Sequence, residues 1–99
     1  MRLQIFQTAI SDLVDGYKFY ESNDNALGDY FLSCLYSDIA SLKVFGGMHA
    51  KPYKNFHRAL SKIFPFAIYY TLHEDLVIIR AVVDCRKDPS WIRRHLKQV

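Results

Sequence analysis

The hydrophobic period of this chain changes once, at the glycine pair Gly46-Gly47. Before that pair, apolar side chains recur every three or four residues, the spacing of a helix that buries one face. After it, aromatic and β-branched residues follow the period of two that is typical of strands. Helices and strands that each carry one apolar face bury those faces by packing in layers. The sequence therefore predicts an α+β fold in one domain, residues 1–99.

Two helices are predicted before the glycine pair. Residues 10–20 and residues 27–42 show the helical spacing, and Ser22-Asn23-Asp24-Asn25 between them supplies turn-forming side chains. Thr8 is placed to cap the first helix, and Gly46-Gly47 to end the second. The pattern predicts a helical hairpin.

Three antiparallel strands are predicted after the glycine pair, over residues 56–64, 66–72 and 76–85. A short strand at residues 2–7 is expected to join them, and Asp88-Pro89-Ser90 is expected to begin a final helix that runs to about residue 97. The predicted order is β-α-α-β-β-β-α, with an antiparallel sheet and the hairpin packed on one face.

Alternation along the last strand assigns its side chains to the two faces of the sheet. Val77, Ile79, Ala81 and Val83 form an uninterrupted apolar set, which we expect to meet the helices. Arg80 then belongs to the other face, which is expected to be partly covered at most.

Charge is unevenly distributed along the chain, although the net charge is only +3. Residues 8–42 hold six acidic side chains against Lys18 alone, whereas residues 43–70 hold five basic side chains and no acid. Residues 86–99 form a second basic segment. Two interpretations stay open: a polarised surface that attracts an acidic partner or nucleic acid, or ordinary solvated faces.

Several classes of function lack their motifs here. The chain has no Gly-rich phosphate loop, no Cys-x-x-Cys, no His-Glu-x-x-His and no Gly-x-Ser-x-Gly. The four histidines fall at scattered spacings, so we expect no metal site and no cofactor. Cys34 and Cys85 are expected to be reduced core residues. The absence of a long apolar segment and of a signal-peptide pattern predicts a cytoplasmic protein without a membrane span.

Cationic residues of the second half suggest one enzymatic possibility. Arg58 and Lys62 lie four residues apart in a predicted strand, and with Arg80 and Arg86-Lys87 they could line a sheet surface that faces phosphates. RNA cleavage without a metal also needs groups that transfer protons. The candidates are His57, Tyr69 and Tyr70. Packing roles for these three residues remain the alternative.

Several segments together resemble the RelE/ParE family of bacterial toxins. They are Asp12-Leu13, the run Phe56-His57-Arg58-Ala59-Leu60, the strand entry Phe64-Pro65-Phe66, and Arg86-Lys87-Asp88-Pro89 followed by Trp91. The resemblance extends from about residue 3 to residue 96. The element order predicted above from periodicity is also the order of that family.

The resemblance implies a small toxin that is neutralised by an antitoxin encoded beside it. Members similar to RelE cleave messenger RNA in the ribosome, and members similar to ParE poison DNA gyrase. The nuclease branch usually places an arginine where this sequence has Ala67, and a tyrosine or histidine near the position of Arg93. The segment Arg86-Lys87-Asp88-Pro89 with Trp91 is closer to the ParE-like branch.

The resemblance therefore implies a toxin that docks on a large target such as DNA gyrase through a basic C-terminal surface. The expected target-binding residues are Arg86, Lys87, Trp91, Arg93 and Arg94. The expected antitoxin-binding residues are Tyr17, Tyr20, Tyr30 and Phe31.

Two alternatives are kept. One is a ribosome-dependent endoribonuclease that uses Arg58, Lys62, Arg80 and Lys87 as phosphate clamps, with Tyr69 or His57 in proton transfer. The other is a non-toxic relative that only binds its partner.

Overall fold

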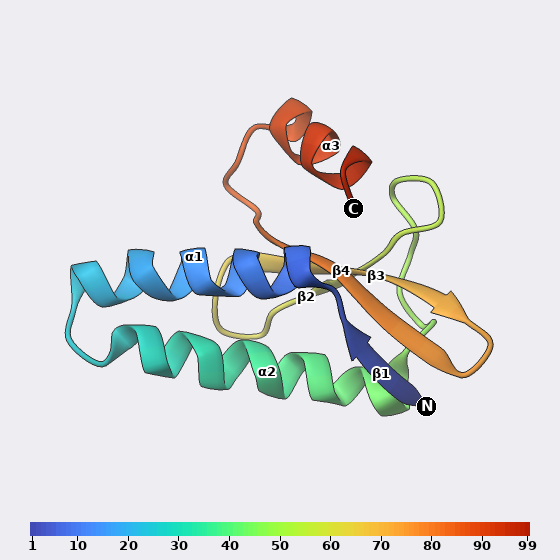
Figure 1. The fold of residues 1–99 in the computed structure, drawn as a ribbon, viewed down its shortest axis with the longest axis horizontal. Helices are drawn as coiled ribbons and strands as arrows, with labels where there is room; N and C mark the ends of the chain where they lie inside the picture. The colour runs from blue at the N-terminus through green and yellow to red at the C-terminus, as the bar shows by residue number, and fades with distance from the viewer.

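Helices lie on both sides of a four-stranded sheet (Figure 1). The computed structural model describes all residues from 1 to 99. Its elements are β1 (Arg2–Ile5), α1 (Gln7–Asn23), α2 (Leu27–Phe45), β2 (His57–Leu60), β3 (Phe66–His73), β4 (Leu76–Asp84) and α3 (Pro89–Lys97). The predicted order β-α-α-β-β-β-α is confirmed. The hairpin of α1 and α2 covers one face of the sheet, and α3 lies over the other (Figure 1).

The strand order in the sheet is β1-β4-β3-β2. Strands β2, β3 and β4 pair antiparallel as predicted, but β1 pairs parallel to β4, so the sheet is mixed. Strand β2 ends at Leu60 and not at Phe64, because the next residues turn toward α2. The Ser61 hydroxyl and the Lys62 backbone N–H both donate to Asp38 Oδ2, at 2.7 and 3.3 Å. Lys62 therefore lies outside the strand that was predicted to align it with Arg58.

The edge of β4 changes partner where β1 ends. The Phe6 backbone N–H still donates to the Ile79 carbonyl at 2.9 Å, but beyond that point α1 takes the place of a strand. The Thr8 hydroxyl donates to the Arg80 carbonyl at 2.8 Å, and the Val82 backbone N–H donates to Asp12 Oδ2 at 2.9 Å. Thr8 is therefore not the cap of α1, which begins after Phe6 without a side-chain cap. Helix α1 instead satisfies the backbone groups that β1 leaves unpaired.

A β-bulge interrupts the pairing of β3 with β4. Tyr69 pairs with Ala81 and Tyr70 with Ile79, which leaves Arg80 as an extra residue on β4. An extra residue in one strand shifts the alternation of every side chain beyond it.

The bulge makes the predicted faces of β4 right for its first half and wrong for its second. Val77 and Ile79 pack against the helical hairpin as expected, because they precede the bulge. Ala81 and Val83 pack on the α3 side of the sheet, and Val82 takes their place toward the hairpin. Both faces of the sheet are consequently apolar at this end.

Two hydrophobic clusters result, one on each face of the sheet. The larger cluster, between the hairpin and the sheet, includes the fully buried side chains Phe31, Leu35, Ile39, Ile68 and Tyr70. The smaller cluster, on the α3 side, consists of Phe56, Ala67, Tyr69, Ala81, Val83 and Leu96. The face that was expected to be partly covered at most is covered by α3 over part of its area.

Close helix packing at Gly16 generates a test of the core. A Cβ atom at Gly16 would lie 2.5 Å from Cζ of Phe31, whose ring is fully buried and packs against Phe64 and Phe66. We expect Gly16→Ala to lower the free energy of unfolding by about 1–3 kcal/mol, because overpacking outweighs the gain in helix propensity. Urea unfolding measures this change. The exposed Ser11→Ala on the same helix should change it by less than about 0.5 kcal/mol. A Gly16→Ala protein as stable as the wild type would show that the Phe31 ring can move.

Candidate functional site

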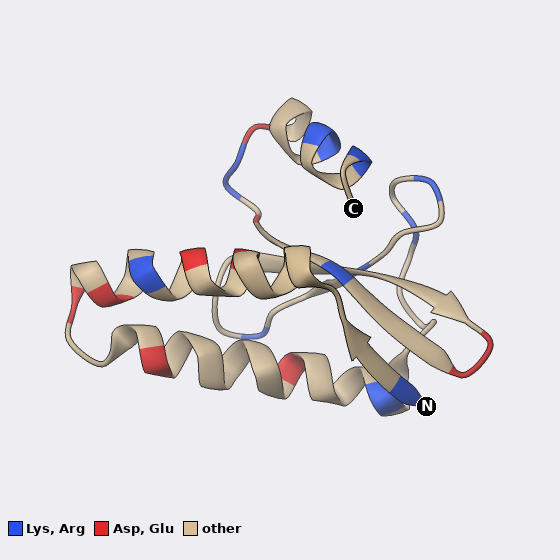
Figure 2. Cartoon of the chain, in the orientation of Figure 1, with Lys and Arg blue, Asp and Glu red and all other residues tan.

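Basic side chains are concentrated on α3 and on the segment before it, which carry Arg86, Lys87, Arg93, Arg94 and Lys97 (Figure 2). Most Asp and Glu lie on the hairpin of α1 and α2 or in its turn, where Lys18 and Lys43 are the basic residues. The α3 side of the sheet is therefore the more basic side.

The turn between β4 and α3 is built around Asp84. Arg86 donates to both carboxylate oxygens of Asp84, from Nε at 2.9 Å and from Nη2 at 2.8 Å, and its backbone N–H donates to Oδ1 at 2.9 Å. This pairing lowers the pKa of Asp84 and raises the pKa of Arg86. Arg86, expected to contact a target, therefore has its charge compensated within the chain, and it orients the turn that leads to α3.

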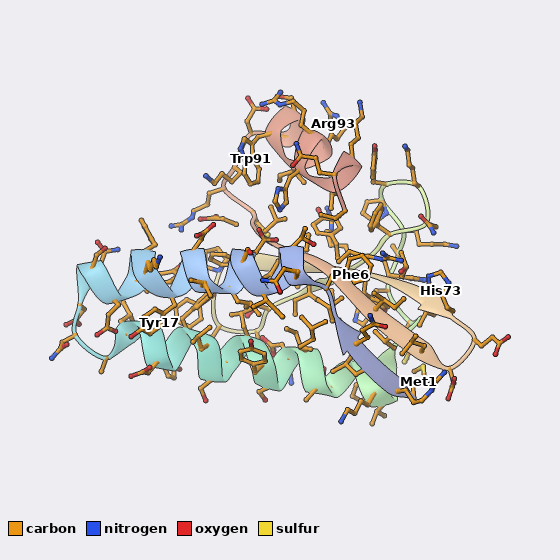
Figure 3. All side chains as sticks on the ribbon, in the orientation of Figure 1. Met1, Phe6, Tyr17, His73, Trp91 and Arg93 are labelled. Carbon is orange, nitrogen blue, oxygen red and sulfur yellow. The ribbon has the colours of Figure 1, made fainter.

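Helix α3 begins where the sequence predicts. Asp88 caps it by accepting from the Ser90 backbone N–H and from the Ser90 hydroxyl, both at 2.8 Å. These two hydrogen bonds, together with the nearby Arg94 and Arg93, lower the pKa of Asp88. Arg93 and Arg94 are both exposed, and Arg93 points away from the rest of the chain (Figure 3).

Trp91 connects the basic segment to the body of the protein. Its ring stacks on His95 with centroids 4.9 Å apart, and Lys87 Nζ lies 4.7 Å from the Trp91 ring centroid. Trp91 is half-buried and packs against the smaller hydrophobic cluster. It anchors α3 with one part of its surface and leaves the rest accessible beside Lys87.

Asp12 is a functional candidate that the sequence pattern missed. The pattern places Asp12 on the polar face of the first helix, yet its carboxylate is half-buried and accepts from His95 Nε2 at 3.0 Å and from the Val82 backbone N–H. Burial raises the pKa of Asp12, and the two hydrogen bonds oppose that rise. Asp12-Leu13 is one of the segments that resemble the RelE/ParE family, but both partners of Asp12 are distant in the sequence, so local spacing does not predict these contacts.

A cavity of about 190 Å³ lies between α1 and the segment that carries Lys87 and Trp91. Apolar groups, carboxylates and one lysine line it together, so it suits a side chain of a partner protein better than a compact ion. The lining residues are Asp12, Asp15, Gly16, Phe19, Phe66, Val82, Val83, Asp84, Lys87 and Trp91.

A second polar cluster lies on the hairpin side of the sheet. The buried Tyr70 hydroxyl accepts from the Gly47 backbone N–H at 2.9 Å and lies 2.6 Å from His49 Nδ1. The His57 ring stacks on Tyr70 at 4.9 Å, and its Nδ1 donates to the His49 carbonyl at 2.7 Å. Burial raises the pKa of Tyr70 and lowers the pKa of His49. These contacts fix the loop before β2 on the sheet.

The residues expected for RNA cleavage are not brought together. Arg58 and Arg80 lie on the α3 face of the sheet, where Tyr69 is almost fully buried. His57 lies on the opposite face against Tyr70. Lys62 lies beyond the end of β2, and Lys87 lies beside Trp91. The structure does not place His57 or Tyr69 where it could transfer a proton beside these cations.

Only half of the aromatic residues expected to bind an antitoxin offer surface. Phe31 is 0% exposed and Tyr20 is 9% exposed, so both belong to the core. Tyr30 is 51% exposed, and Tyr17 is half-buried. Phe19, which was not singled out, is 50% exposed on α1. Phe31 belongs to the helical series Leu27, Phe31, Leu35, Ile39 and Leu42 that forms the buried side of α2, and Tyr30 lies outside that series.

The two cysteines lie in different environments. Cys34 and Cys85 are both free thiols, and Cys34 packs partly against the larger cluster, but Cys85 is exposed and not a core residue. No group of three or more His, Cys, Asp or Glu side chains is arranged to hold a metal ion. No helix has the length and apolar character needed to cross a membrane.

Comparison with known proteins identifies the fold. No model of a known protein family matches this chain. No curated protein matches it either. Among solved structures, the fold is similar to a chain of the chromosomal ParDE TA system from P. aeruginosa, with a TM-score of 0.78 and 14% sequence identity. The similarity covers 85% of this chain and 95% of that chain. The chain therefore has the fold of a component of a ParDE toxin–antitoxin system.

The contacts of Asp12 generate a second test. Asp12→Ala would leave the Val82 N–H without its acceptor and α3 without the hydrogen bond from His95. We expect the free energy of unfolding to fall by about 1–3 kcal/mol, the cost of a buried unpaired group. Asp15→Ala, an exposed carboxylate on the same helix, is the matched control and should stay within about 0.5 kcal/mol of the wild type. If the two variants changed the free energy of unfolding equally, Asp12 would not stabilise the fold by connecting α1 to β4 and α3.

Proposed function

We propose that this chain is the toxin of a type II toxin–antitoxin pair. The observation that carries the proposal is the fold similarity to a chain of the ParDE system, which spans 95% of that chain. The resemblance of the Phe64-Pro65-Phe66 and Arg86-Lys87-Asp88-Pro89 segments to RelE/ParE toxins supports it independently. The proposed activity is growth inhibition inside the bacterial cytoplasm by binding to a large target such as DNA gyrase.

The proposed docking surface is formed by Lys87, Trp91, Arg93 and Arg94. Arg93 and Arg94 are exposed on α3 and form no ion pair within the chain, so their charges are available to an acidic partner. Trp91 supplies an aromatic surface beside Lys87 of the kind that often anchors protein interfaces. Arg86 contributes by holding the turn in place through Asp84.

Binding is favoured over RNA cleavage as the mode of action. The nuclease alternative needs a proton-transfer group close to Arg58 and Arg80, but Tyr69 is buried beneath that face and His57 lies on the other one. A docking surface requires only accessible charge and apolar area, and α3 has both.

The proposed antitoxin interface lies on the hairpin around Tyr17 and Tyr30, with Phe19 nearby in the sequence. The carboxylates of Glu21 and Asp29 lie near Tyr17 and raise its pKa, so acidic groups border this ring. An antitoxin segment that folds on binding would cover the aromatic rings and place basic side chains beside these carboxylates.

Charge reversal on α3 tests the docking surface. Controlled expression of the wild-type chain in bacteria should arrest growth, and Arg93→Glu with Arg94→Glu should raise the inducer concentration needed for arrest by about tenfold or more, because like charges at a docking surface oppose binding. Growth curves across inducer concentrations measure this. Lys18→Glu with Lys43→Glu reverses the same number of charges on the hairpin helices and should leave arrest unchanged. Equal loss of toxicity in both double variants would argue against α3 as the docking surface.

The nature of the damage distinguishes the proposed mode of action from the nuclease alternative. DNA breaks that depend on gyrase, with intact messenger RNA, are the expected result. Codon-specific cuts in messenger RNA that Arg86→Ala abolishes would overturn the proposal. Stable overexpression without growth arrest would favour the non-toxic relative.

Loss of aromatic surface on the hairpin tests the antitoxin interface. We expect Tyr17→Ala with Tyr30→Ala to weaken binding to the protein encoded by the neighbouring reading frame by about tenfold or more, because aromatic anchors dominate such interfaces. Co-purification and calorimetric titration of the two proteins measure this. Tyr36→Ala, which removes another exposed aromatic ring of α2, is the control and should bind normally. An unchanged affinity in the double variant would place the antitoxin elsewhere.

A further inference from the structure

One stripe of side chains on α1 lines the cavity beside Lys87 and Trp91. Asp12, Asp15 and Phe19 recur three and four residues apart, so they lie on the same face of the helix. Asp15 and Phe19 are exposed, which places them at the mouth of the cavity. The deeper part of the lining comes from the sheet and is apolar and almost fully buried.

The volume of the cavity limits its occupant to one side chain. Clefts for drug-sized ligands measure about 300–1,000 Å³. An apolar cavity of about 150 Å³ in another protein admits a molecule as small as benzene. The cavity beside α1 measures about 190 Å³, much closer to the second value. A single long side chain of a partner protein fits this volume.

Carboxylates outnumber basic groups in the lining. The acidic residues are Asp12, Asp15 and Asp84, and the basic residue is Lys87. Two of the carboxylates have partners within the chain, since Arg86 donates to Asp84 and His95 lies 3.0 Å from Asp12. The Lys87 ammonium lies against the Trp91 ring and joins none of the ion pairs. The charge of the lining therefore favours a cationic occupant over an anionic one.

Asp15 is the carboxylate that remains for a partner. It is exposed and joins none of the ion pairs of the chain. Burial raises the pKa of Asp12, and the negative charge of Asp15 raises it further. A cation placed beside Asp15 would offset the repulsion between these two carboxylates, whereas an anion would add to it.

The aromatic ring at the mouth favours a guanidinium over an ammonium group. Phe19 is 50% exposed and lines the same cavity as Asp15. A guanidinium stacks on an aromatic face, binds a carboxylate through two N–H groups at once, and is more weakly hydrated than an ammonium. The apolar stem of an arginine also covers apolar surface, which the deeper part of the lining supplies.

We propose that the cavity beside α1 binds one arginine side chain of a partner protein, with Asp15 as its ion-pair partner and Phe19 as the ring that stacks on it. The inference rests on the proposed function for the source of this arginine, which is the antitoxin. Tyr17 lies two residues from both Asp15 and Phe19, so it is on a different face of α1. The antitoxin interface proposed above is therefore extended to a second face of the helix.

Titration of the full chain with a peptide tests the cavity. The probe is a short peptide with blocked ends and one arginine between glycines, and NMR follows the Phe19 amide and the Trp91 indole N–H. The wild type should bind it saturably, and Asp15→Asn should weaken binding by about tenfold or more, because a hydrogen bond between charged groups is lost. Phe19→Leu keeps an apolar side chain without the ring and should weaken binding by about two- to fivefold.

Matched controls apply to both the chain and the peptide. Asp24→Asn removes an exposed carboxylate at the end of α1, outside the cavity, and should leave the affinity unchanged. Urea unfolding checks that Asp15→Asn stays folded. Peptides with lysine, citrulline or glutamate in place of arginine should all bind more weakly, and binding of the arginine peptide should weaken as salt is added.

Several results would overturn the chemistry of the site. The proposal is wrong if no peptide binds, if the lysine, citrulline or glutamate peptide binds as tightly as the arginine peptide, or if Asp15→Asn and Asp24→Asn bind alike. Self-association of the wild type in sedimentation that Asp15→Asn abolishes would assign the cavity to an arginine of a second copy of this chain, and would overturn its assignment to the antitoxin.

The source of the arginine is tested with the protein encoded by the neighbouring reading frame. Asp15→Asn should weaken its affinity for the chain by about tenfold or more in calorimetric titration, and Asp24→Asn should not. An unchanged affinity would show that the arginine is not the antitoxin's. Growth arrest by the wild-type chain is scored separately. A chain that binds the arginine peptide without arresting growth would contradict the proposed toxin and leave the chemistry of the cavity intact.

Discussion

The fold depends on how the exposed edge of β4 is satisfied after β1 ends. A strand edge without a partner leaves backbone donors and acceptors that cost free energy when they are buried. Helix α1 supplies the missing groups, since Thr8 binds the Arg80 carbonyl and Asp12 accepts from the Val82 N–H. Asp12 also accepts from His95, so the same carboxylate positions the hairpin, the sheet and α3 relative to one another.

The bulge at Arg80 determines what each face of the sheet can do. With unbroken alternation, β4 would turn Ala81 and Val83 toward the hairpin together with Val77 and Ile79, and it would place Val82 on the other face with Arg80 and Asp84. The extra residue moves Ala81 and Val83 to the α3 side, where they join Tyr69 and Leu96 in a second cluster. This cluster holds α3 against the sheet, and the half-buried Arg80 lies next to it on the same face. One irregular position therefore produces both the anchored α3 and the position of Arg80 beside it.

The sequence predicts those features that depend on local spacing. The change of period at Gly46-Gly47 is enough to predict the element order, and Asp88 is recognisable as the cap of α3 because its partner Ser90 lies two residues away. Pairing across the sheet is different, because the register, the parallel direction of β1 and the bulge depend on residues far apart in the chain. For the same reason the candidate site was only partly predictable. Asp12 has its partners 70 and 83 residues away, so its burial depends on contacts that helical spacing does not reveal.

The position of the cavity between α1 and Trp91 bears on how an antitoxin would neutralise the proposed toxin. An antitoxin that covered only Tyr17 and Tyr30 would leave α3 free on the other side of the sheet, because the two surfaces do not overlap. The cavity is lined by Phe19 and Asp15 from α1 and by Lys87 and Trp91 from the α3 segment, so it connects α1 with the docking surface. A partner segment that ran along the hairpin and placed one side chain in this cavity would also cover Lys87 and Trp91. Neutralisation would then follow from direct overlap with the docking surface and would need no change in the conformation of the sheet.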